Sequence, residues 1–163
     1  MQTLPQRLAL MGRLAIEGSD TELASFLSRR AVAELPSSAP FIWNALALCA
    51  FVRNLIRYQT EDPETFTGLE ALLWLGAGDC DDVSIALAAL LLRCGWPVRW
   101  AVGTVGGRPL HVWVQTHEPG PGRGDWVDLD CSTWRVRPGE SPMILGELDT
   151  LELYELTGQR WEQ

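Results

Sequence analysis

The segment from Asp79 to Gly95 constrains the fold more than any other part of the chain. Apart from Ser84, every residue in 83–92 is apolar, so a helix over this stretch has no polar face. Asp79 suits the N-cap position, with Asp82 three residues later near the first free backbone amides, and Gly95 suits the position just after the helix end. A helix that is apolar on all sides must be covered on all sides. The sequence therefore predicts a central buried helix.

Further helices are predicted before this segment and strands after it. Apolar residues recur at helical spacing in the first half of the chain, over residues 8–32 with a break at 19–20, 41–56 and 67–75. Loops are expected at 36–40 and at 58–66, the second containing Pro63. Strands are expected over 98–102, 110–116 and 125–130, and residues 150–156 form either a strand or a closing helix. Short Gly- and Pro-rich turns imply antiparallel neighbours. We therefore expect an α+β fold, with N-terminal helices and the buried helix packed on a small antiparallel sheet.

Composition narrows the range of partners. The chain has 163 residues, which suits a single domain over 1–163, and a net charge of −8 with no lysine. This balance argues against binding to nucleic acid or to an anionic membrane surface. The longest apolar run, 85–92, is far shorter than the roughly 20 residues that span a bilayer. With no signal-peptide pattern at its start, the protein is expected in the cytoplasm with reduced cysteines.

Cys80 is the candidate nucleophile because it lies in the first turn of the buried helix. Unpaired backbone amides and the helix dipole favour a negative charge there, and the same amides can bind an oxyanion. Asp79, Asp81 and Asp82 oppose this by raising the pKa of the thiol. We expect the amides and a nearby protonated His111 to prevail, so that the pKa of Cys80 falls below the free value of about 8.5.

His111 and Asp130 are expected to meet at one edge of the sheet, where they would serve as base and orienting acid. If Thr116 pairs with Asp125, then Asp130 lies opposite His111, and a shift of two residues would bring Asp128 there instead. A metal site built from Cys80, His111 and Asp130 would need a fourth ligand, and no paired spacing supplies one. We therefore expect no metal and no cofactor.

Three motifs in this order resemble the transglutaminase-like superfamily, a papain-related group. They are GDCDDVSIALAALLLRCGWPVRWAVG, HVWV and WVDLDCS, and they place the family core at about residues 50–132 with a helical extension over 1–40. The resemblance implies Cys80 as nucleophile, His111 as general base and Asp130 as orienting acid. Cys131–Ser132 replaces a common Pro-Thr, a departure expected to affect the turn and not the triad. The acidic run Asp79–Asp82 resembles the corresponding segment of small bacterial and phage-encoded members of the superfamily.

The resemblance and the triad together favour a cysteine-dependent acyl-transfer enzyme that works through a thioester. A hydrolase, either peptidase or amidase, acting on a peptide or protein substrate is preferred to an amine-transferring enzyme. The alternative is a noncatalytic scaffold with a protein assembly partner, such as a phage structural or assembly protein.

The remaining cysteines and the second histidine are expected to have no part in catalysis. Cys49 and Cys94 are expected in the core and Cys131 in a structural position, while His117 is expected to be solvated in a loop. Some transglutaminases use an upstream tryptophan as an oxyanion donor, and Trp43 is a weak candidate for that role.

Overall fold

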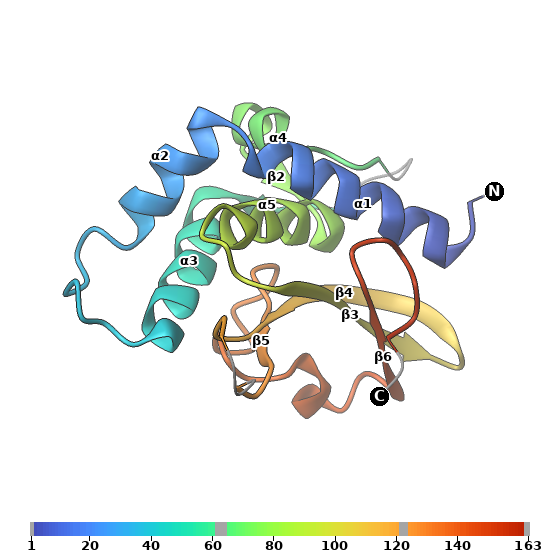
Figure 1. Cartoon of the computed structure of the whole chain (residues 1–163). Helices are drawn as coiled ribbons and strands as arrows, with labels where there is room; N and C mark the ends of the chain where they lie inside the picture. Colours follow the sequence, from blue (N-terminus) through green and yellow to red (C-terminus); the bar gives the residue numbers. More distant parts are fainter. Residues whose placement is uncertain (1, 61–64, 121–123, 162–163) are drawn as a thin grey trace.

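The protein is built from a helical layer and a sheet with one helix buried between them (Figure 1). The structure is a computed structural model that describes residues 2–60, 65–120 and 124–161. Its helices are α1 (Leu4–Ser19), α2 (Glu22–Ala31), α3 (Phe41–Leu55), α4 (Leu69–Leu75) and α5 (Cys80–Arg93), with a 3₁₀ turn at Pro142–Leu145. Its strands are β1 (Arg57–Tyr58), β2 (Ala77–Gly78), β3 (Val98–Val105), β4 (Arg108–Thr116), β5 (Val127–Leu129) and β6 (Thr150–Tyr154). The expected α+β class is confirmed. The predicted loop at Pro63 falls outside the described residues.

Helix α5 is the predicted central helix. All of its residues from Asp81 to Leu91 are buried, with the other helices on one side and β4 on the other. The Asp79 side chain accepts hydrogen bonds from the amides of Asp81 and Asp82, and the Asp82 side chain binds the Asp79 amide in return. Gly95 follows the helix end with a φ of 77°. The expected N-cap and terminal glycine are both present, and the reciprocal bond from Asp82 completes a capping box.

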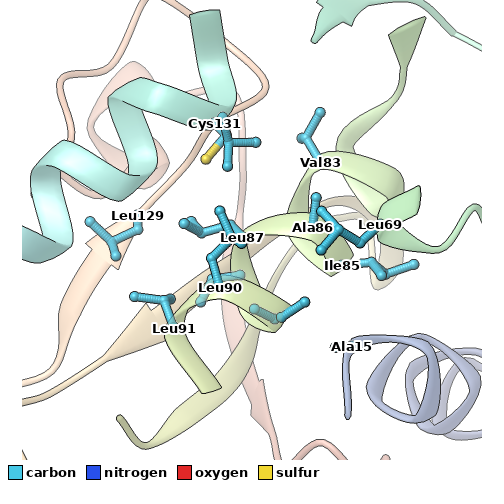
Figure 2. Close-up of a cluster of buried hydrophobic side chains, with 14 of the residues drawn as sticks. Ala15, Leu69, Val83, Ile85, Ala86, Leu87, Leu90, Leu91, Leu129 and Cys131 are labelled. Carbon is cyan, nitrogen blue, oxygen red and sulfur yellow. The ribbon is translucent and has the colours of Figure 1, made fainter. Parts of the chain in front are cut away.

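The core surrounds α5 (Figure 2). Its apolar side chains meet Leu69 from α4 and Ala15 from α1 on one flank, and Leu129 and Cys131 from the β5 region on the other. A fully buried Leu or Val contributes about 1.5–3 kcal/mol relative to an exposed one. The apolar run therefore fixes α5 firmly, including its first turn, where the candidate nucleophile lies.

The main sheet has the strand order β5-β4-β3-β6, and every neighbouring pair is antiparallel. Residues 150–154 are thus a strand and not a closing helix. The β3–β4 pairing shifts by one residue next to Gly103, which leaves Leu110 as the extra residue on β4. Such a bulge bends the strand and re-aims its side chains, and here it lies directly before His111.

A second, two-stranded sheet was not expected from the sequence. Strand β1 pairs in parallel with β2, and Tyr58 lies opposite Gly78. A Cβ atom added to Gly78 would lie 2.7 Å from Leu72 and 2.8 Å from Asp82. The glycine therefore allows β2 to pack closely on α4 and α5, and so positions the residues that lead into Cys80.

Two expected environments are wrong. Cys94 was expected in the core but is exposed, because α5 ends there and the chain turns away. His117 was expected in solvent but is buried: its Nδ1 donates to the carbonyl oxygen of Glu118 and its ring packs edge-on against Trp126. Within the described residues, no helix is both long enough and apolar enough to cross a membrane.

Candidate active site

Cys80 opens α5 and lines a cavity of about 180 Å³ together with His111. Leu4, Leu8 and Met11 of α1 close the cavity from the helical side. The hydroxyl of Ser84, one turn along α5, donates to the carbonyl oxygen of Val112 at 3.3 Å and so ties α5 to β4 beside His111. The thiol and the imidazole are therefore held on facing elements of one cavity.

The environment of Cys80 contradicts the expected low pKa. Burial raises the pKa of the thiol above its usual value, and the charges of Asp81 and Asp79 raise it further, while a hydrogen bond with the backbone of Val112 lowers it. Burial is the largest cause, and the cap of the helix adds to it by occupying amides that a thiolate could use. The Asp79 carboxylate already accepts from the amides of Asp81 and Asp82, which would otherwise stabilise a thiolate. The resting group is therefore a thiol that needs a base.

Asp81 is the acidic neighbour with the largest effect on this thiol. Its pKa is raised to about 6 by burial and by the charge of Asp79, while Arg7 lowers it. Arg7 reaches across from α1 and pairs with Asp81 at 3.1 Å. Thus α1, which the sequence placed in an N-terminal extension, supplies both a wall and a charge to the cavity.

His111 and Asp130 form a direct hydrogen bond, with His111 Nε2 2.8 Å from Asp130 Oδ2. Asp130 is only 2% exposed. Burial alone would raise the pKa of this carboxyl group, but its hydrogen bonds with His111 and Ser132 bring the pKa below the usual value. An ionised Asp130 accepts from Nε2–H, which leaves Nδ1 as the basic nitrogen of the neutral ring.

The expected strand register is wrong, although the expected pair is present. Thr116 pairs with Val127 and not with Asp125, so the register is displaced by two residues, in the direction that moves Asp128 away from His111. In this alignment Asp130 follows the end of β5 and reaches His111 diagonally. Asp128, the alternative acid, accepts instead from the side chains of Trp113 and Gln115.

Two further residues hold Asp130, and the sequence analysis missed both roles. The amide and hydroxyl of Ser132 donate to Asp130 Oδ1 at 2.8 and 2.6 Å. The guanidinium of buried Arg53, on α3, donates to the backbone carbonyl oxygen of Asp130. The turn after Asp130 therefore does contact the triad, contrary to expectation. The role of Ser132 could have been predicted, because the family often has threonine at this position and both residues carry a hydroxyl. Nothing in the sequence pointed to the role of Arg53.

The cluster of Asp79, Cys80 and Asp81 brings three donor atoms within 4.8 Å of one another, a spacing that could hold a metal ion. Both carboxylates already have other tasks. Asp79 caps α5, and Asp81 pairs with Arg7. In this structure the two carboxylates therefore cap α5 and pair with Arg7, next to the thiol of Cys80.

The sequence of the chain identifies its family. Residues 29–131 match the profile of the transglutaminase-like superfamily, which covers more than half of the chain. The chain belongs to the transglutaminase-like superfamily. The match begins before the expected core start near residue 50, within α2. No curated protein matches the chain significantly.

Solved structures agree with this fold. A candidate cysteine protease from Cytophaga hutchinsonii is 19% identical with a TM-score of 0.51, over 67% of this chain and 37% of that one. A candidate protease from Parabacteroides distasonis is 12% identical with a TM-score of 0.65, over 99% of this chain and 31% of that one. At these identities the likeness concerns the fold alone. The chain spans about a third of the length of each of these structures.

Removing the charge of Asp81 is expected to speed alkylation of Cys80. In Asp81→Asn the thiol loses a negative neighbour, its pKa falls, and iodoacetamide should react about 3- to 10-fold faster at pH 7.5, since one pKa unit changes the thiolate fraction about tenfold. The gain should vanish well below pH 6, where Asp81 of the wild type is itself protonated. The matched control is Asp20→Asn, at an exposed position. Slower alkylation of Asp81→Asn would instead mean that Asp81 helps to remove the thiol proton.

Proposed function

We propose that this protein is a cysteine-dependent acyl-transfer enzyme that acts mainly as a hydrolase of amide or peptide bonds. The observation that carries the proposal is the hydrogen bond of 2.8 Å between His111 and Asp130. Because this bond uses Nε2, the other ring nitrogen, Nδ1, is left to act as the base. Cys80 lines the same cavity as that imidazole. A thiol, a base and an orienting acid are the groups that nucleophilic acyl transfer requires.

The raised pKa of Cys80 defines the order of events. His111 Nδ1 takes the thiol proton as sulfur attacks the acyl carbon, and the imidazolium, stabilised by Asp130, then gives that proton to the leaving amine. The product is a thioester on Cys80. Water next attacks the thioester with His111 again as base, the carbon–sulfur bond breaks, and the thiol and a carboxylic acid are released. Each proton is taken and returned by one imidazole.

Hydrolysis is preferred to amine transfer because water has room beside the base. A second cavity of about 370 Å³ borders His111 and Asp130 on the side of Ser132 and Thr133. Efficient transfer to an amine needs water to be excluded from the thioester. The acceptor that we propose is therefore water, and the donor is a peptide or protein.

Competition between water and an amine tests this choice. The protein is incubated with a pool of glutamine-containing peptides and a labelled primary amine, with Cys80→Ala as control. Peptide cleavage or ammonia release is expected to exceed amine incorporation. Because the chain contains no lysine, it cannot crosslink to itself through lysine side chains, so the background is low. Incorporation that exceeds cleavage and requires Cys80 would replace the hydrolase with a transferase. No turnover of either kind would favour a scaffold with a protein assembly partner.

A further inference from the structure

Acyl transfer at Cys80 creates a negatively charged oxygen that needs hydrogen-bond donors. Within the described residues, the backbone amide of Cys80 has no acceptor, whereas the next three amides of α5 are occupied. Those of Asp81 and Asp82 donate to the Asp79 side chain, and that of Val83 donates to the Asp79 carbonyl oxygen. The Cys80 amide is thus free to serve as one donor. A second donor normally completes such a site.

Trp43, the weak candidate from the sequence, does not fit this role. Its side chain is 53% exposed in the first turn of α3, and it lines neither of the two cavities that border His111. The second donor has to come from an element that is fixed relative to the start of α5.

Strand β1 is such an element. The amide of Arg57 donates to the carbonyl oxygen of Gly76 at 3.0 Å, and that of Gln59 donates to Gly78 at 2.9 Å. Tyr58, between them, lies opposite Gly78, two residues before the nucleophile. Its side chain is 47% exposed and lines the second cavity together with His111 and Asp130. The pairing of two short strands therefore places a phenol beside the His111–Asp130 pair, in a cavity that shares Leu110 and His111 with the cavity of Cys80.

The chemistry of this phenol suits a donor. Its hydroxyl has no hydrogen-bond partner among residues 2–60, 65–120 and 124–161. Burial raises the pKa of Tyr58, and negative charge on Asp79, and on Cys80 when its thiol is ionised, raises it further. The group therefore keeps its proton at neutral pH and can donate it to a hydrogen bond without losing it.

We infer that the Tyr58 hydroxyl donates to the oxyanion formed at Cys80, alongside the Cys80 amide. The inference rests on the proposed function, since an oxyanion forms only if Cys80 attacks an acyl group. The hydroxyl stabilises the tetrahedral intermediates of both thioester formation and thioester hydrolysis. It leaves the nucleophilicity of the thiol unchanged, because it acts on the oxygen of the substrate and not on sulfur.

Tyr58→Phe tests this role, with p-nitrophenyl acetate as the acyl donor and the rate of Cys80→Ala subtracted. Loss of one oxyanion donor is expected to lower kcat about 100- to 1000-fold, with KM nearly unchanged. Alkylation of Cys80 by iodoacetamide, which forms no oxyanion, should keep its rate and its pH profile. Tyr154→Phe is the matched control, since it removes the only other tyrosine hydroxyl, which binds Glu152.

The outcomes separate this inference from the function on which it rests. Wild-type turnover that Tyr58→Phe leaves unchanged overturns the role of Tyr58 alone. A parallel loss of turnover and of alkylation also overturns it, because Tyr58 would then act on the thiol or on the packing around it. An absence of Cys80-dependent turnover in the wild type overturns the proposed function and this inference together.

Discussion

Replacing Cys80 with alanine is expected to abolish turnover, while replacing Cys94 leaves turnover unchanged. Loss of the nucleophile in a triad typically lowers kcat by about 10⁶-fold, so the residual rate should match the background. Cys94 lies just beyond the other end of α5, about 20 Å away at 1.5 Å per residue. Each variant removes one cysteine sulfur, and the two sulfurs lie at opposite ends of the same helix, so the comparison isolates the position of Cys80.

Labelling gives a second measurement of the same prediction. Cys94 is exposed, so its rapid alkylation says nothing about the nucleophile, and the experiment belongs in a Cys94→Ala background. There iodoacetamide should label Cys80 ahead of buried Cys49 and Cys131. Because burial raises the pKa of Cys80, the rate should keep rising above pH 8. Labelling that persists after Cys80 is also removed would show that another thiol is the reactive one.

Much of the fold could be predicted because local and tertiary signals agree around α5. The apolar run needs cover on all sides, and the aspartates before it favour the start of a helix. The motifs placed Cys80 in the first turn of α5 and His111 in β4, whereas Asp130, expected at the end of a strand, lies just after β5. The prediction of an antiparallel sheet followed from the short turns between the strands.

Other features depend on contacts that no local pattern records. Strands β1 and β2 have two residues each, too few for a periodic signal. The β4–β5 register is set by side chains, since Asp128 binds both Trp113 and Gln115 across the pair. The burial of His117 depends on its contact with the ring of Trp126, which lies beyond the loop that follows His117. The pKa of Cys80 depends on burial and neighbouring charges, and the expectation that the helix amides and a protonated His111 would outweigh the aspartates gave the wrong direction.

The two aspartates near β5 provide the sharpest test of the site, because their carboxylates face different partners. Asp130→Asn should lower turnover roughly 100- to 10,000-fold, since an amide neither holds the Nε2–H tautomer of His111 nor stabilises the imidazolium. Asp128→Asn should leave turnover within about tenfold of the wild type. Its cost should fall on stability, about 1–3 kcal/mol, because buried donors of Trp113 and Gln115 lose a charged acceptor.

The pH dependence of unfolding distinguishes a structural effect of Asp130→Asn from a catalytic one. The folded-state pKa of Asp130 is lowered, so its ionised form stabilises the fold above the unfolded value of about 3.9, and this contribution is lost as the pH falls through the folded value. Wild type and Asp130→Asn should therefore differ in melting temperature at pH 7 and converge in strong acid. Turnover measured at pH 7, well below the melting temperature of both proteins, then reports on the role of the carboxylate toward His111. If Asp128→Asn costs more turnover than Asp130→Asn there, Asp128 and not Asp130 orients the base.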